Sequence, residues 1–424
     1  MKRIVSILLC IFAFSMIFAE LNPPHRYLEA GVDVNASAGN NWFNLSDFQN
    51  EVLVIDFTEM ANNLKNGYLV ELNADTKAYF NINSKKIRFG FFTGVEEIGA
   101  IQLSQDLINF LGKGNAEGDH SINAAVGMDM SVYVEAGLSM KTFWGKLGLG
   151  ITPTMFAPVV YVPRRDSSVS VSFNDDASIN VKTNASVAVY SPFGMSNDMA
   201  DENGITLNSD EIFHDAGLDI SLSAEYALKP SLDIGFAVNH IPSVPAKLRY
   251  KMEYEMEQEF NFDSIIDMAT KSEEEPAEDV PSDEDFLGEE ENDIILPEPA
   301  FEALETPYSL YRPVELSVAA AYRPFGEWFD VNGSLGVVFY KPAYLNYSFG
   351  AGLHLVKMCK LGGHLIDLSL TSAFDDRVWT QQFDFALNLR VLEITFKASS
   401  CGTEFAKSFT GSGLGVGVGI KMGI

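Results

Sequence analysis

The sequence predicts an all-β fold: a transmembrane antiparallel β-barrel of about 14 strands (roughly 12 to 16), with an N-terminal helical plug or hatch segment. Three observations lead there: a secretory leader, long two-faced alternations throughout the 424 residues, and no long apolar run after the leader. A membrane helix needs ~18 or more consecutive apolar residues. Only helices and closed barrels satisfy every backbone group in lipid, so a membrane location requires a barrel.

Residues 1–19, "MKRIVSILLCIFAFSMIFA", have two basic residues, an apolar core and a final alanine. This order is typical of a secretory signal peptide, and we expect cleavage before Glu20. The barrel then comprises residues 20–424. A lipoprotein leader modified at Cys10 is the alternative, although the large Leu9 precedes it where a small residue is expected.

The first strand after the leader is "YLEAGVDVNASAG", residues 27–39, in which apolar and polar residues alternate strictly. Such alternation gives a strand two unlike faces. The same pattern recurs from Val70 and, at greatest length, from Ile122 to Met140. It ends in "GLGVGVGIKMGI" at Ile424. The strand at 27–39 is predicted either to be the first of the barrel, closing against this last one, or to belong to the plug.

Alternation alone does not say which face meets the exterior. In an outer-membrane barrel the apolar face meets lipid and the polar face lines the lumen, the reverse of a soluble sandwich. The leader, the long strands and the terminal strand favour the barrel. Aromatic residues near strand ends fit interfacial girdles: Tyr68, Trp144, Tyr190, Tyr322, Trp328 and Trp379.

The polar parity defines the residues expected to line the lumen or bind a ligand. They are Glu71, Asp75, Lys77, Asp129, Glu135, Asp219, Glu225, Asp384, Asn388 and Arg390. His354 also falls on this parity and is predicted to be a hydrogen-bonded lumen residue. Between Leu387 and Leu392 the parity slips without a typical turn residue, which predicts a β-bulge.

Two segments break the alternation and are predicted to be helical. Residues 41–67 have a capping-box spacing at Ser46 and Gln49 and a closing glycine at Gly67. The apolar residues of this plug or hatch candidate are Phe48, Val52, Ile55, Phe57, Met60 and Leu64. A shorter helix is expected within 103–115, ending at Gly112. The plug helix either enters the lumen, with a hydrophobic ligand pocket behind it, or lies on an end of the barrel.

The segment 263–306 is predicted to be a disordered acidic loop. Residues 263–305 hold 17 acids and one lysine, more than half of the chain's net charge of −29. Few apolar residues and several prolines prevent burial of a core. It is either a solvated loop or a collector of divalent cations or a cationic partner. The side of the membrane on which it lies is left open.

No enzyme chemistry is predicted. None of the six histidines stands in a nucleophile motif, and no metal site or cofactor is indicated. Cys359 and Cys401 form one disulfide or remain two free thiols. The strong acidity argues against nucleic acid as a partner.

Two stretches carry a family resemblance: "GFAVNHIPSVPAKLRYKMEYEMEQEF" and, after the acidic segment, "YRPVELSVAAAYRPFGEWFDVNGSLGVVFY". They resemble the FadL-type outer-membrane transporters of long-chain fatty acids. The shared pattern corresponds to Pro313, Ala321, Tyr322, Arg323, Pro324 and Trp328. The closing "WTQQFDFALNLRVLEITF" resembles terminal regions of FadL-like proteins of spirochaetes. The family's Asn-Pro-Ala hatch motif is matched by Asn22 and Pro23, with Pro24 in place of alanine.

This resemblance implies a barrel of fourteen strands, an N-terminal hatch inside it, and diffusion of hydrophobic molecules. The function predicted is therefore a channel or transporter for small, hydrophobic, fatty-acid-like molecules in the outer membrane of a diderm bacterium. Its expected partners are outer-membrane lipid, the hydrophobic substrate and the barrel-assembly machinery. The alternative is a surface-exposed structural or adhesive protein with a plugged barrel, and a third class is an outer-membrane hydrolase.

Overall fold

The computed structural model describes residues 26–44, 55–64, 67–113, 121–173, 179–193, 213–262, 301–339, 343–357, 364–375, 378–402, 404–409 and 411–424. The expected signal peptide, most of the acidic segment, Cys359, Phe48 and Val52 lie outside these ranges. So do Ser46 and Gln49, the expected cap of the plug helix.

Strands make up most of the described chain. They are β1 (Leu28–Asn40), β2 (Tyr68–Asn83), β3 (Ile87–Leu103), β4 (Ser121–Trp144), β5 (Leu147–Phe173), β6 (Ile179–Ser191), β7 (Gly217–Lys229), β8 (Leu232–Val244), β9 (Ala246–Phe262), β10 (Glu302–Leu310), β11 (Val314–Tyr322), β12 (Phe329–Phe339), β13 (Tyr344–Lys357), β14 (His364–Asp375), β15 (Val378–Asn388), β16 (Leu392–Gly402) and β17 (Gly413–Gly423). The helices are α2 (Phe57–Asn63), α3 (Gln105–Lys113) and the 3₁₀ turns η3 (Gly326–Trp328) and η4 (Lys407–Phe409).

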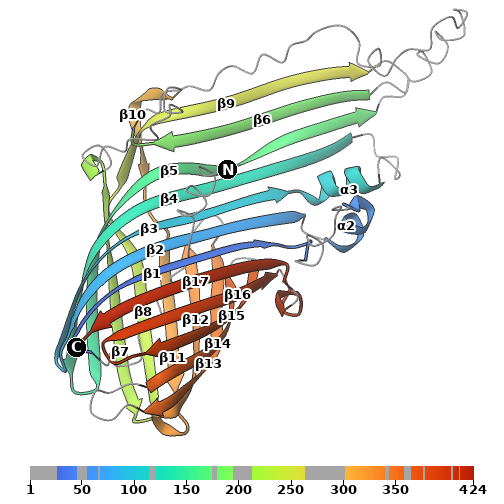
Figure 1. Ribbon diagram of the computed structural model, residues 1–424. Helices are drawn as coiled ribbons and strands as arrows, with labels where there is room; N and C mark the ends of the chain where they lie inside the picture. The colour runs from blue at the N-terminus through green and yellow to red at the C-terminus, as the bar shows by residue number, and fades with distance from the viewer. Residues whose placement is uncertain are drawn as a thin grey trace, which may run out of the picture.

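Fourteen of these strands close an antiparallel barrel, which confirms the predicted fold class. Hydrogen-bonded neighbours run from β1 through β5, then to β7, β8 and β11, and on through β17. The ring closes where β1 pairs with β17, with Val32 opposite Ile420 and Asp33 opposite Gly419 (Figure 1). The opening alternation of the sequence is therefore the first strand of the barrel.

The remaining three strands, β6, β9 and β10, form a sheet that continues from β5 beyond the ring. β5 has 27 residues, but β7 pairs only with its first part, from Leu147 to Phe156. From Tyr161 to Phe173, β5 pairs instead with β6, which pairs with β9, which pairs with β10. We call β5 from Tyr161 onward, β6, β9 and β10 the sheet extension; β6 and β9 run beyond the ring toward the upper right of Figure 1.

The two ends of the barrel differ. Short connections lie at what we call the turn end, at residues 84–86, 145–146, 230–231 and 389–391. Both β1 and β17 meet there, and the Tyr27 amide donates to the Ile424 carbonyl at 2.7 Å. The opposite end, the loop end, carries α2, α3 and the sheet extension (Figure 1).

The outer wall is apolar around the whole ring. Exposed large apolar residues occur on strands on every side: Phe80, Phe91, Met140, Ile151, Leu222, Phe236, Val318, Leu335, Phe349, Leu370, Phe383, Phe396 and Val418. Soluble monomers do not expose a continuous apolar band of this kind, whereas transmembrane barrels require one. Of the expected girdle, Trp144, Tyr322 and Trp328 are exposed, but Tyr190 is buried in a cluster described below.

The glycines of β17 have a steric reason. A Cβ at Gly419 would collide with the carboxylate of Asp33, and one at Gly417 with the amide oxygen of Asn35. Both polar side chains come from β1, the paired strand. Glycine on the inner face of the last strand therefore leaves room for polar groups of the first strand.

The helices lie at the loop end and pack on one another. Met60, Ala61 and Leu64 from α2 are buried with Ile108 of α3. The Asp56 side chain caps α2 by accepting from the Glu59 amide at 2.9 Å; the predicted helix start at Ser46 lies outside the described residues. α3 agrees with the shorter predicted helix and continues to Lys113. Among the described residues, no helix has the length and apolarity to cross a membrane.

Two local predictions are wrong. The parity slip after Leu387 is a tight turn between β15 and β16, not a β-bulge, and Arg390 has a positive φ of 74° in it. The side chain of Asn388 accepts from the Arg390 amide at 3.1 Å, a turn-forming role typical of asparagine. The acidic segment was expected to reach 306, but β10 begins at Glu302.

Candidate channel lumen

A cavity of about 1260 Å³ lies inside the ring. At mid-height and toward the turn end its wall is mostly polar and charged, as the inward parity predicts. Toward the loop end the wall includes Met130, Tyr133, Tyr161, Val162 and Leu310. The acids Glu71, Asp129 and Asp375 line the same end, so apolar and charged groups stand side by side there.

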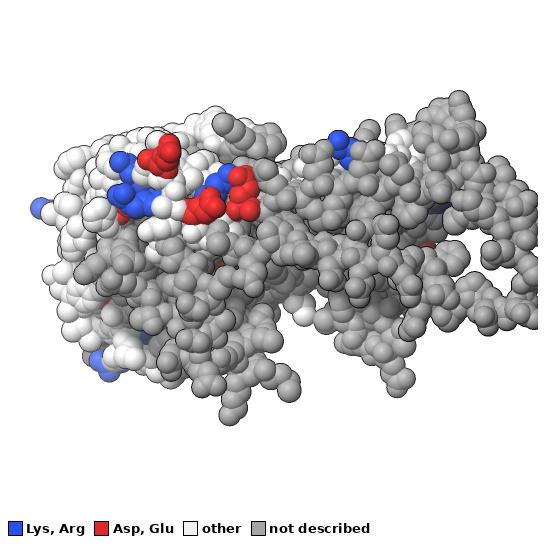
Figure 2. Space-filling view, turned by 90° about the horizontal axis from the view of Figure 1, so that it is seen from above, with Lys and Arg blue, Asp and Glu red and all other residues white. Residues whose placement is uncertain are grey.

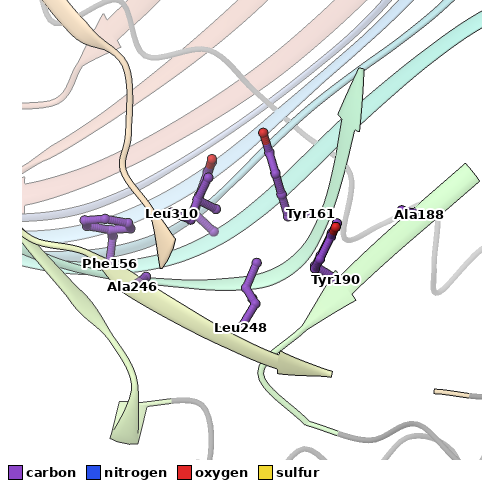
Figure 3. Packing of buried hydrophobic residues seen from close by; sticks show 8 residues of the cluster. Phe156, Tyr161, Ala188, Tyr190, Ala246, Leu248 and Leu310 are labelled. Atoms are coloured by element: carbon purple, nitrogen blue, oxygen red, sulfur yellow. The ribbon is translucent and has the colours of Figure 1, made fainter. Parts of the chain in front are cut away.

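An aromatic cluster stands at the loop end of this cavity, where β5 leaves the ring. Tyr161, Tyr190 and Tyr308 pack on one another, with ring centroids 4.6 Å apart for Tyr190 and Tyr308 and 5.8 Å for Tyr161 and Tyr308. Leu248 and Leu310 complete it from β9 and β10. Figure 3 shows Tyr161, Tyr190, Leu248 and Leu310 of this cluster lying close together. We call these five residues the aromatic rim.

Arg312, directly after β10, enters the wall of the barrel and holds several acids together. Its side chain is 3% exposed and contacts Asp219 at 2.7 Å and Glu135 at 2.8 Å, with Glu96 at 3.9 Å. The guanidinium also lies over the Phe156 ring, 4.8 Å from its centroid. These contacts hold the segment between β10 and β11 in place, and with it the position of β10 and the aromatic rim against the ring.

A second cavity of about 180 Å³ adjoins this group and is lined by Asp75, Lys77, Glu135, His240 and Arg312, among others. The Nδ1 atom of His240 lies 3.3 Å from the Asp219 carboxylate. Arg312 Nη2 and Asp219 Oδ1 are buried without a hydrogen-bond partner among the described residues. Buried polar atoms of this kind commonly bind ordered water.

The turn end of the lumen is closed in by ion pairs. Arg26 contacts Glu393 at 3.2 Å and donates to Asn388 at 2.9 Å, and Lys421 contacts Glu393 at 2.8 Å. His354 bridges Asp330 and Asp367, as the expected hydrogen-bonded lumen residue. Opposed charges in such a narrow space neutralise one another and narrow the passage.

The structure gives most of the predicted lumen residues an inward position. Glu71, Asp129 and Asp384 line the large cavity; Asp75, Lys77 and Glu135 line the small one. Asp219 and Asn388 are buried in the networks above, and Glu225 pairs with Lys141 at 2.5 Å. Arg390 is the exception, because it lies exposed in the β15–β16 turn. Whether any of them binds a ligand stays a prediction.

The ligand pocket expected behind the plug helix stays a prediction, because residues 45–54 lie outside the described part of the chain. Of its apolar candidates that the structure describes, Ile55 is exposed, and Phe57, Met60 and Leu64 face α3. None of them lines either cavity. The apolar residues of α2 pack on α3 at the loop end, so they do not line the polar lumen.

Sequence reasoning missed Arg312 and the aromatic rim. Arg312 lies between two strands, where alternation says nothing about direction. An isolated arginine after an apolar strand end, "SLYRP", was the available signal. By their position in the sequence, Tyr190 and Tyr308 resemble interfacial girdle residues. Only the sheet extension, which buries Tyr190 and packs the two rings together, shows that they have another role. Cys401 is a free, buried thiol in the structure.

The sheet extension is tied to the ring by a charged pair. Arg249 of β9 holds Asp215, in the turn before β7, through two donors, one of them 2.8 Å from the carboxylate. These hydrogen bonds hold the pKa of Asp215 below its ordinary value. On the face in Figure 2, several acidic and basic side chains of the described part lie close together in one patch, with other basic side chains apart from it.

A closed barrel with an apolar exterior and a charged interior defines the class: a β-barrel of the transmembrane type. The family described as "Family of unknown function (DUF5723)" matches residues 29–364, and the chain belongs to this family. No curated protein matches the sequence.

Solved structures with distant likeness include three barrels. The TodX monoaromatic hydrocarbon channel, in a deltaS2S3 mutant, is 8% identical over 95% of this chain and 91% of that one, with a TM-score of 0.44. The Ralstonia pickettii toluene transporter TbuX is 8% identical over 96% and 93%, with a TM-score of 0.43. A Pseudomonas aeruginosa FadL homologue is 10% identical over 95% and 92%, with a TM-score of 0.40.

Proposed function

We propose that this protein is an outer-membrane channel of a diderm bacterium that lets small hydrophobic, fatty-acid-like molecules diffuse through its barrel. The observation that carries the proposal is the large cavity, whose wall combines charged residues with the aromatic-rim residues Tyr161 and Leu310. Apolar pockets with a few placed polar groups are typical sites for small ligands. A molecule with an apolar tail and a polar head suits such a mixed wall.

The passage needs no covalent step. The apolar outer wall contacts outer-membrane lipid, and the terminal strand β17 serves as the segment that the barrel-assembly machinery recognises. Tyr161 lines the cavity and Tyr308 stacks on it. The Tyr161 ring supplies a flat apolar surface with a polar hydroxyl, which suits transient contact with an amphipathic molecule. Before the molecule leaves the lumen, the ion pairs at the turn end must separate, or the molecule must pass beside them.

Ligand binding at the aromatic rim is testable in proteoliposomes. The double variant Tyr161→Ala/Tyr308→Ala is expected to weaken binding of the fluorescent probe 1-anilinonaphthalene-8-sulfonate, and its displacement by laurate, by about tenfold, which corresponds to ~1.4 kcal/mol. Removing two stacked rings takes away both buried area and ring contacts. Fluorescence titration measures the change.

Tyr322→Ala is the matched control, because Tyr322 is an exposed tyrosine of the outer wall at the turn end. It should leave probe binding unchanged. Equal binding by wild type and the double variant, or no binding and no conductance by the wild type, would contradict the proposal; the second result would favour the plugged surface protein.

We also propose that the loop end faces the cell exterior. Outer-membrane barrels have short periplasmic turns and longer external loops, and β9 and β10, which flank the acidic segment, belong to the sheet extension at the loop end. In a variant with Cys359 and Cys401 replaced by serine, Lys247→Cys should react with a membrane-impermeant maleimide on intact cells. Lys146→Cys, an equally exposed lysine at the turn end, should react only after lysis. The reverse labelling pattern would invert the orientation.

A further inference from the structure

Inside the turn end of the lumen, β13 and β14 bring two histidines and an aspartate together. His354 lies directly opposite Asp367 in the strand register. One ligand atom each from His354, His364 and Asp367 fall within 4.8 Å of one another. All three residues line the large cavity, so ions in the lumen can reach them.

His364 has no other role in the described structure. Its side chain is 7% exposed, and no described residue hydrogen-bonds to its ring. The ring lies beside that of His354, with centroids 5.4 Å apart and planes inclined by 31°. The ring nitrogens of His364 are accessible from the cavity, so a bound metal ion would supply the partner that the described residues do not.

A carboxylate already positions the other histidine. Asp330, which is 4% exposed, lies 2.7 Å from Nε2 of His354 and itself accepts from Asn332 at 3.1 Å. Metal-binding histidines are characteristically oriented in this way by a carboxylate on the second ring nitrogen. The Nδ1 atom is thereby turned to Asp367, 2.6 Å away.

The backbone explains how His364 joins this group. His364 and Asp367 are three residues apart, so strict alternation would place them on opposite faces. Opposite them, Val356 has a φ of 58°, an uncommon conformation for a β-branched residue. The ladder resumes with Lys357 opposite His364. The β13–β14 pair is irregular at this end, and the side chains of both His364 and Asp367 line the lumen there.

We propose that His354, His364 and Asp367 bind a divalent transition-metal ion of the zinc type, with Asp330 as a positioning residue. Two imidazoles and one carboxylate favour zinc over calcium or magnesium, which prefer oxygen ligands. Ligands about 2.0–2.2 Å from a tetrahedral ion stand ~3.3 Å apart, so His354 Nδ1 and Asp367 separate slightly to admit it. The fourth position faces the lumen.

The test uses the full-length chain in detergent micelles, stripped with a chelator and titrated with Zn²⁺ by calorimetry and with Co²⁺ by visible absorption. We expect one Zn²⁺ per chain and the absorption of tetrahedral Co²⁺. His364→Ala and His354→Ala should each weaken Zn²⁺ binding at least a hundredfold. Asp330→Asn should weaken it about 10–100-fold and retain the Co²⁺ absorption, as expected for a residue that acts through His354.

His214→Ala is the matched control, because His214 is exposed and far from this cluster in the ring. It should bind Zn²⁺ as the wild type does. Heat-modifiable migration on a gel verifies that each variant is folded, and His364→Gln replaces His364→Ala if the latter is not. Absence of Zn²⁺ binding by the wild type, or unchanged binding by the folded His354 and His364 variants, would overturn the proposal. Neither result bears on passage of hydrophobic molecules.

Discussion

Replacing Arg312 by methionine is expected to lower the free energy of unfolding by about 3–5 kcal/mol, the usual cost of removing one partner from a buried ion pair. Methionine retains much of the apolar packing on Phe156 but leaves Asp219 and Glu135 without their shared cation. Asp219 is 2% exposed on its side chain, so bulk solvent does not replace the lost cation. The expected observation is a lower temperature for loss of the heat-resistant form on a gel.

Arg323→Met is the control for this variant. Arg323 also contacts a carboxylate, that of Asp233 at 2.7 Å, but both side chains are more exposed, at 16% and 19%. A partly exposed pair contributes ~1 kcal/mol or less, so the shift should be small. Adding Asp219→Asn to Arg312→Met should restore part of the lost stability. Equal effects of the Arg312 and Arg323 variants would refute the role given to Arg312.

Placing a lysine on the outer wall is expected to block assembly. Val418 lies at the middle of β17, is 43% exposed and faces outward between Val34 and Phe396. A lysine facing lipid at the midplane costs about 2–4 kcal/mol. Val418→Lys should therefore reduce the amount of heat-modifiable protein in outer-membrane fractions severalfold.

The matched change on the inner face is Thr395→Lys. Thr395 lies at a similar height on the neighbouring strand, opposite Gly419, and lines the large cavity. A lysine there meets water and the carboxylates of Asp33 and Glu393, so normal amounts of folded barrel are expected. If both variants assembled equally well, the outer wall would not be a lipid-facing surface.

Alternation was enough to predict the two faces of the barrel. The period of two is a local property of an extended chain, and it placed Asp129, Asp384 and Asn388 inside without knowledge of any strand partner. It failed at Arg390, and it made no prediction for His364. In both places the backbone leaves regular strand geometry, and side-chain direction no longer follows from sequence position.

Strand partners were beyond what alternation could decide. β8 pairs with β11, about 70 residues later in the chain, and the sheet extension between them follows from β5 being longer than β7. Tyr308, in this inserted part, looked by sequence like any strand aromatic. The same applies to Arg312, whose acidic partners come from three other strands.

The sequence by itself determined the fold class, the lipid-facing and lumen-facing sides of the strands and the approximate number of strands. These follow from hydrophobic periodicity, which each segment carries alone. Only the tertiary structure decided which fourteen strands close the ring, where the aromatic rim stands and which histidines meet. Those depend on register between distant segments, because a side chain finds its partners only when the strands on either side of it are in place.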